Sequence, residues 1–136
     1  MKKFILQELV DQNNGYFKLE DAAKVGVSRT TAIQFAKDMN LKKEAPGIYI
    51  SEDAWPDRLY LLQTRNKKII FSHETALFLH GLSDREAAQP TVTVKRGYNA
   101  SHLTTQGIRV HTVRPEWFET DTTTVVTAAG NEVRLY

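Results

Sequence analysis

The sequence predicts an α+β fold divided into two domains, and three observations support this prediction. Apolar residues before position 45 recur at the three- and four-residue spacing of amphipathic helices. Several segments after position 66 alternate apolar and polar residues, as half-buried strands do. Turn-forming residues gather between these regions, at 45–47, 51–53 and 55–57. We therefore expect a boundary near residue 52, with domains at residues 1–52 and 53–136.

The composition is that of a globular protein: 136 residues, of which 41% are hydrophobic and 25% charged. No apolar run approaches the roughly 18 residues of a membrane-spanning helix. Gln7 and Glu8 interrupt the apolar start of the chain before a signal peptide could form. Cysteine is absent, which excludes disulfides, thiol catalysis and cysteine-bound zinc. These features favour a cytoplasmic protein without a membrane partner.

Three short helices are predicted in the first domain. Periodic apolar residues indicate one helix over residues 3–12 and a second over 19–25. Gly26 supplies the turn that follows, because a residue without a Cβ atom adopts positive φ at little cost. The hydroxyl of Ser28 then caps a third helix that covers about residues 29–40.

The third helix has an apolar and a polar side. The apolar side is the buried stripe of Ala32, Phe35, Ala36 and Met39. The wedge between the second and third helices should be filled by Val25, Val27, Phe35 and Met39. A β-hairpin is predicted over residues 41–50, with its turn at Pro46 and Gly47. Three helices, a glycine turn and a hairpin in this order predict a winged helix-turn-helix.

The polar side of the third helix is the candidate DNA-binding surface. A helix fits the major groove of DNA, where Arg29 can make two parallel hydrogen bonds to guanine and Gln34 to adenine. Threonines beside them can reach phosphates, bases or the thymine methyl group. The candidate DNA-binding residues are Ser28, Arg29, Thr30, Thr31, Gln34, Lys37, Lys42 and Lys43.

Lysines of the first domain are expected to neutralise DNA phosphates. They are Lys2, Lys3, Lys18, Lys37, Lys42 and Lys43. Residues 1–50 hold eight basic and six acidic side chains, so the whole net charge of +2 lies in this part of the chain. Three-helix units with a hairpin also bind proteins, and a protein-interaction module or a solitary transcription factor is therefore the alternative function.

Helices and strands are mixed after residue 52. Helices are expected over 57–64 and 73–80, the second capped by Ser72 and ended by Gly81. Its apolar stripe, Ala76, Leu77, Leu79 and Leu82, should face the core. Strands are expected over 67–71, 91–95, 108–113, 122–128 and 132–136, with turns at 97–99 and 129–131. Because the last strand runs to Tyr136 without a capping loop or helix, the pattern favours a C-terminally truncated chain.

Candidate catalytic and metal-binding residues are few. His73 and His80 lie seven residues apart on one predicted helix, too far for chelation, and no spacing ties the other two histidines to them. No Gly-x-Ser-x-Gly motif surrounds Ser72. Asp57 could begin a metal-dependent nuclease motif, but no Glu-x-Lys follows it. We therefore expect no enzyme, no catalytic residue, no metal and no cofactor, with a metal-dependent nuclease as the alternative.

Several short motifs stand in a characteristic order along the chain. They are Gly47-Ile48-Tyr49, Pro56-Asp57, Ser72-His73-Glu74-Thr75-Ala76-Leu77, Leu79-His80-Gly81-Leu82, Thr91-Val92-Thr93-Val94, Gly97-Tyr98-Asn99 and the final segment from Gly130 to Tyr136. In order and spacing they resemble the AbiEi-type antitoxins of bacteria, and the resemblance covers essentially the whole chain.

The resemblance implies a DNA-binding transcriptional autorepressor that acts as the antitoxin of a type IV toxin–antitoxin, or abortive-infection, system. Such a protein represses its own operon by binding inverted repeats in double-stranded DNA, where a homo-oligomer can form. It counteracts a nucleotidyltransferase toxin without a stable complex. The DNA contacts of the family map here to residues 28–37, Lys42 and Lys43. Members continue beyond the last strand into further helices, which agrees with a truncated chain.

Overall fold

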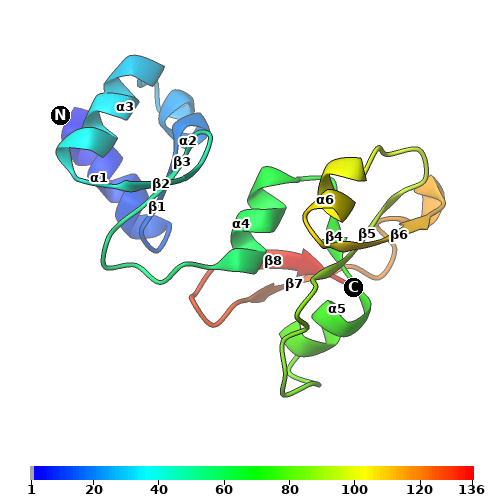
Figure 1. The fold of residues 1–136 in the computed structure, drawn as a ribbon. Coiled ribbons are helices and arrows are strands. Elements are labelled where there is room, and N and C mark those ends of the chain that lie inside the picture. The colour runs from blue at the N-terminus through cyan, green and yellow to red at the C-terminus, as the bar shows by residue number, and fades with distance from the viewer. Residues whose placement is uncertain (1) are drawn as a thin grey trace. The chain divides into compact units, whose positions relative to one another are not determined.

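The computed structural model describes residues 2–136 and has a mixed α+β architecture, as the sequence predicts. The chain divides into two compact units, an N-terminal unit of Met1–Pro56 and a C-terminal unit of Asp57–Tyr136. Figure 1 shows the first unit in blue to cyan and the second in green to red. Within residues 2–136, no helix has both the length and the apolar character needed to cross a membrane.

Three helices and a small antiparallel sheet form the N-terminal unit (Figure 1). The helices are α1 (Lys2–Gln12), α2 (Leu19–Lys24) and α3 (Arg29–Asp38). The strands are β1 (Tyr16–Lys18), β2 (Lys42–Ala45) and β3 (Ile48–Ile50), in the order β1-β3-β2. The predicted helices and hairpin are confirmed, whereas β1 is an unpredicted third strand that joins the free edge of the hairpin.

Phe17 of β1 lies in the core of this unit. Its side chain is fully buried, and its ring centroid lies 5.2 Å from that of Phe35 and 6.4 Å from that of Tyr49. The prediction that Val25 and Met39 fill the wedge between α2 and α3 is wrong, since they are 44% and 38% exposed. Both stand at the C-terminal caps of their helices, where the chain turns away from the core. Phe17, from a strand that the prediction lacked, belongs to this core instead.

The ends of α3 are set by local chemistry. The Oγ atom of Ser28 accepts a hydrogen bond from the backbone N–H of Thr31 at 3.3 Å, which confirms the predicted cap. Gly26 adopts a φ of +82° in the preceding turn, as expected of a residue without a Cβ atom. After the helix, Asn40 adopts a φ of +55°, and the N–H of Leu41 bonds to the carbonyl of Ala36 at 2.9 Å.

The C-terminal unit is a five-stranded mixed sheet with helices on both faces. The helices are α4 (Arg58–Arg65), α5 (His73–Leu79) and α6 (Ser101–Thr105), with a 3-10 helix η1 at Pro115–Trp117. The strands are β4 (Ile70–Phe71), β5 (Thr91–Lys95), β6 (Arg109–Val113), β7 (Thr123–Val126) and β8 (Glu132–Leu135). Figure 1 shows α4 and α6 above the sheet and α5 below it. The sequence did not predict α6 or η1.

The strand order is β6-β5-β4-β8-β7, so the two-residue strand β4 occupies the centre. It pairs antiparallel with β5 and parallel with β8, and β5 pairs parallel with β6. The alternation of Val92, Thr93 and Val94 predicted a half-exposed face at Thr93, but Thr93 is buried, as is Thr91, because helices cover both sides of the sheet. Their polar groups are satisfied: the Thr93 hydroxyl donates to Ser72 Oγ at 2.8 Å, and Thr75 Oγ1 accepts from the Thr91 N–H at 2.8 Å.

The helix α5 differs from its prediction in the face that it buries. Thr75 and Ala76 are buried, whereas Leu77 and Leu82 of the expected core stripe are exposed. Ser72 stands at the N-cap but makes no capping bond with its side chain; its hydroxyl instead accepts a bond from Thr93. Contact with β5 therefore orients this short helix more strongly than its apolar periodicity does.

Candidate nucleic-acid interface

The polar side of α3 is exposed, as the candidate DNA-binding surface requires. Thr30, Gln34 and Lys37 follow one another at i, i+4 and i+7 and form one solvent-facing stripe. Arg29 is exposed at the first helical position, beside this stripe. On the opposite side, Ala32, Phe35 and Ala36 are buried in the core of the unit. The helix is thus fixed along one side and accessible along the other.

Gln34 has a partner that the sequence interpretation missed. Its Nε2 atom donates to Oδ1 of Asp38 at 2.9 Å, one helical turn further on. A glutamine and an aspartate four residues apart on a helix commonly pair in this way, so the spacing was the available signal. The pair places a negative charge at the end of the stripe. The second N–H of Nε2 and the Oε1 atom of Gln34 stay available to a base while this bond persists.

Ser28 and Thr31 belong to the structural cap of α3. The Ser28 hydroxyl donates to Thr31 Oγ1 at 2.9 Å while Ser28 Oγ accepts from the Thr31 N–H. Thr31 is half-buried, unlike Thr30 beside it. Among the predicted site residues, these two therefore position the helix, and Arg29, Thr30, Gln34 and Lys37 present free surface from it.

Lys42 and Lys43 are exposed on β2, at the edge of the three-stranded sheet. As neighbours in a strand, they point to opposite faces of the sheet. They lie opposite Ile50 and Tyr49, respectively, and an irregularity follows between Lys43 and Ala45. One lysine therefore faces away from any surface that the other contacts.

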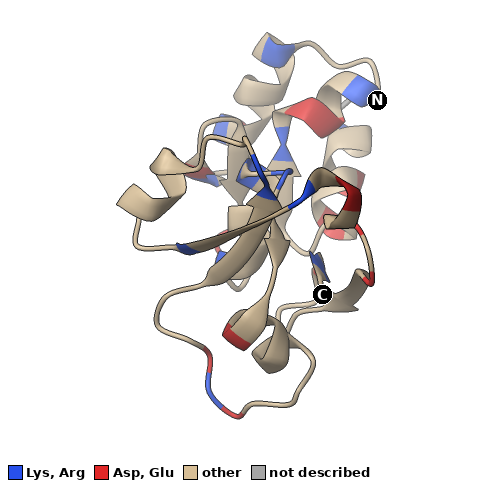
Figure 2. Ribbon diagram, turned by 90° about the vertical axis from the view of Figure 1, so that its right-hand side faces the viewer, with Lys and Arg blue, Asp and Glu red and all other residues tan. Residues whose placement is uncertain are grey.

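The remaining predicted phosphate contacts are dispersed. Lys3 is exposed on α1 and Lys18 is half-buried at the end of β1, while the side chain of Lys2 lies outside the described part of the structure. Figure 2 shows Lys and Arg segments on several elements, with Asp and Glu segments among them. Charge alone therefore does not single out an interface, and the stripe on α3 is defined by its geometry.

Asp57, the candidate nuclease residue, is buried at the N-cap of α4. Its Oδ1 atom accepts from the N–H of Tyr60 at 3.1 Å. Its Oδ2 atom accepts from Nδ2 of Asn131 at 3.0 Å and from the hydroxyl of Thr127. These bonds join the start of α4 to the turn between β7 and β8, so a structural role accounts for this carboxylate.

The four histidines are not grouped around a common point where they could bind a metal ion. His73 stacks on His111 with ring centroids 4.0 Å apart, and its Nδ1 atom lies 3.0 Å from Ser72 Oγ. His80 contacts the carbonyl of Tyr136, and His102 contacts Asn66 Oδ1 at 2.9 Å. Within residues 2–136, no three His, Cys, Asp or Glu side chains are grouped so that they could hold a metal ion.

Comparison of the chain with models of known protein families and with curated proteins finds no match.

Proposed function

We propose that the protein is a DNA-binding transcriptional repressor whose N-terminal unit is a winged helix-turn-helix. The observation that carries the proposal is the exposed stripe of Thr30, Gln34 and Lys37 on a helix whose other side is buried. Arg29 stands at the start of this helix, where recognition helices contact base edges. A helix held in this way can present its exposed side chains to a major groove while its other side stays packed in the core.

Each exposed side chain has a distinct task in this proposal. Arg29 reads guanine, and Gln34 reads adenine with its Oε1 atom and one N–H of Nε2. Lys37 binds a phosphate at the other end of the helix. The hairpin of β2 and β3 acts as the wing, where one of Lys42 and Lys43 contacts the DNA backbone.

The biological setting is proposed from the resemblance to AbiEi-type antitoxins. The protein represses its own operon from inverted repeats, as a homo-oligomer on DNA, and acts in the cytoplasm as the antitoxin of a nucleotidyltransferase toxin. No stable complex with the toxin is needed in this scheme. The single observation that tests this setting is a neighbouring gene that encodes a nucleotidyltransferase.

DNA recognition is tested by replacing Arg29 and Gln34 with alanine together. Duplexes are first selected from a random pool with the unaltered protein, and affinities are then measured by fluorescence anisotropy at several salt concentrations. We expect the double variant to lose about 1–3 kcal/mol of sequence discrimination for each base contact removed. Of Lys42→Ala and Lys43→Ala, the variant that removes the phosphate contact should weaken all duplexes alike and lower the salt slope by about 1, whereas the other should bind nearly normally.

A matched control replaces Gln12 and Lys24, an exposed glutamine and an exposed basic residue outside α3, and should bind the selected duplex normally. Unchanged binding of the Arg29→Ala, Gln34→Ala variant would show that α3 is not the recognition helix.

The alternative function, a protein-interaction module, is favoured by exposed apolar side chains. Phe4 is 76% exposed on α1, and Ile5 and Val25 also face solvent. Apolar groups on a surface are common in protein-binding sites. Absent or salt-insensitive DNA binding, together with a stable protein partner that Phe4→Ala releases, would favour this function over DNA recognition.

A further inference from the structure

A large pocket lies in the C-terminal unit, at the end of the sheet where β4 begins and β5 ends. Its volume is about 670 Å³, within the usual range of small-molecule sites. Four separate segments of the chain line it: the residues before β4, the end of β5 with the following loop, the segment after η1, and β8. The lining residues are Lys67, Lys68, Lys95, Arg96, Gly97, Tyr98, Asn99, Phe118, Glu119 and Arg134.

The pocket concentrates positive charge. Residues 57–136 contain ten basic and eight acidic side chains, and five of the basic ones but only Glu119 of the acidic ones line this pocket. Within residues 2–136, Lys68, Lys95 and Arg96 form no ion pair with a carboxylate. Like charges brought together repel one another, and such a cluster is stabilised when an anion enters it.

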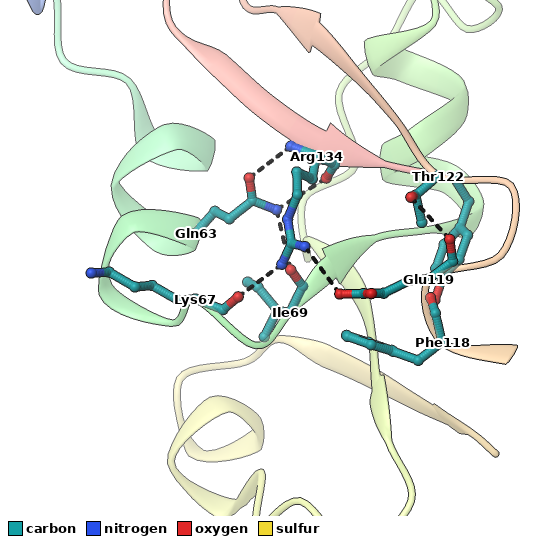
Figure 3. Close-up of polar contacts among 8 residues, drawn as sticks. Gln63, Lys67, Ile69, Phe118, Glu119, Thr122 and Arg134 are labelled. Atoms are coloured by element: carbon teal, nitrogen blue, oxygen red, sulfur yellow. Dashed lines mark hydrogen bonds and ion pairs between the residues drawn. The ribbon is translucent and has the colours of Figure 1, made fainter. Parts of the chain in front are cut away.

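Arg134 is held rigidly at the wall of the pocket (Figure 3). Its guanidinium donates to the carbonyl of Lys67 at 2.8 Å and lies 3.8 Å from the Glu119 carboxylate. The side-chain amide of Gln63 holds the backbone of the same residue: it accepts from the backbone N–H of Arg134 at 2.7 Å and donates to the backbone carbonyl of Arg134 at 3.0 Å. Gln63 also donates to the carbonyl of Ile69 at 3.2 Å. The arginine thus contributes a preorganised charge, which costs less to immobilise on binding.

Aromatic and small residues complete the lining. The ammonium group of Lys95 lies 5.5 Å from the centre of the Phe118 ring, which holds it beside the buried aromatic wall. Gly97 has a φ of +94°, and no heavy atom lies within 4 Å of the place where a Cβ atom would stand. Tyr98 is half-buried and packs against the core of the unit. An aromatic group of a ligand therefore has a rigid neighbour beside the charged groups.

We propose that this pocket binds a small ligand that carries two or more phosphate groups, of the class of nucleoside di- and triphosphates. Lys68, Lys95 and Arg96 bind the phosphate oxygens, with Arg134 at the side wall. Tyr98 contacts the base or sugar. The pocket shares no residue with α3, so this proposal does not depend on DNA binding.

The test measures binding of ATP and of inorganic triphosphate to the full chain by isothermal titration calorimetry, at low salt and with EDTA present. Both ligands should bind saturably, and AMP should bind at least tenfold more weakly than ATP. Tighter binding of ATP than of inorganic triphosphate assigns a contribution to the base and Tyr98, whereas equal binding assigns the site to the phosphate chain alone.

The assignment to this pocket is tested with the Lys68→Gln, Arg96→Gln double variant, whose affinity for ATP should fall at least tenfold. The control, Arg85→Gln with Arg114→Gln, removes the same charge from exposed positions that do not line the pocket, and should bind ATP nearly normally. The circular dichroism spectrum confirms that each variant is folded. No saturable binding of either ligand by the unaltered protein, or an equal loss in both double variants, would overturn the proposal.

Discussion

The two units present their basic side chains in opposite ways. In the N-terminal unit, Lys37 and Arg29 stand on the convex surface of one helix, and their placement follows from the period of that helix. In the C-terminal unit, Lys68, Lys95 and Arg134 are far apart in the sequence, and the sheet brings them to one concave pocket. A convex surface is therefore decided by residues close together in the sequence, whereas a pocket depends on how distant strands pair.

The same difference agrees with the ligands that we propose for the two units, which are DNA for the N-terminal unit and a small phosphate-bearing molecule for the C-terminal unit. A protruding helix suits a groove that is wider than itself, such as the major groove of DNA. A concave site with converging charges suits a ligand small enough to be surrounded. Each unit has its own cluster of buried apolar residues, so damage to one core should spare the site of the other.

Phe17→Ala should have the strongest effect, and this effect should be confined to the N-terminal unit. Phe17 is fully buried against Phe35 of α3, so its loss should cost about 3–5 kcal/mol of unfolding free energy. Urea denaturation followed by circular dichroism measures this change. DNA binding should be lost, while ATP binding to the C-terminal unit remains.

The control for this change is Phe4→Ala, because Phe4 is exposed and its loss should alter stability by less than about 0.5 kcal/mol. Equal destabilisation by both substitutions would contradict the role given to Phe17 and to β1.

Asp38→Asn should have a smaller effect, on the exposed side of α3. The substitution removes a negative charge from the end of the stripe and the carboxylate that holds Gln34. Affinity for DNA should rise by about threefold to tenfold at low salt, and the gain should shrink as salt screens the charge. Fluorescence anisotropy with the selected duplex measures it.

Asp11→Asn is the matched control, since Asp11 is an exposed aspartate on α1 whose carboxylate accepts a hydrogen bond from Gln7 in the same i, i+4 geometry. A gain of the same size in this control would assign the effect to net charge and not to the stripe.

The smallest effect concerns Tyr136, beside the concave pocket. Burial raises the pKa of its phenol above 10.0; nearby Arg134 lowers it in part, and Glu119 raises it. The protonated hydroxyl donates to the carbonyl of Phe118, a residue of the pocket wall. Because the folded state favours the protonated form, the stabilisation is complete below pH 10 and is lost as the pH rises through the folded pKa.

Tyr136→Phe tests this dependence. At pH 8 the variant should be less stable by about 1 kcal/mol, the ordinary contribution of one hydrogen bond. Urea denaturation at increasing pH should show that the unfolding free energies of the variant and the unaltered protein become equal above pH 10. If the difference in unfolding free energy stayed constant with pH, ionisation of the Tyr136 phenol would not be coupled to folding.

The sequence allowed good prediction wherever one short segment decides the structure. The Ser28 cap, the turn at Gly26 and the exposed face of α3 depend on residues within a few positions of one another, and all three are found as expected. The same reasoning missed β1, because three residues after a turn carry too little periodicity to indicate a strand.

Long-range pairing is what the sequence could not reveal. Nothing in the neighbourhood of Lys68 indicates that antiparallel pairing of β4 with β5 places Lys95 and Arg96 beside it. Parallel pairing of β4 with β8 then adds Arg134, more than sixty residues away. The burial of Thr93 was missed for a similar reason, since it depends on α5 and its N-cap residue Ser72, which cover β5.

The short central strand β4 has a consequence for synthesis on the ribosome. Phe71 pairs with Val92 on one side and with Leu135 on the other, so one edge of this strand finds its neighbour only after residues 132–135 have been made. Until then a nascent chain holds Ile69, Ile70 and Phe71, all fully buried in the finished protein, next to an unpaired strand edge. Release of an incomplete chain would therefore yield an aggregation-prone fragment, which chaperones would bind or proteases would degrade rapidly.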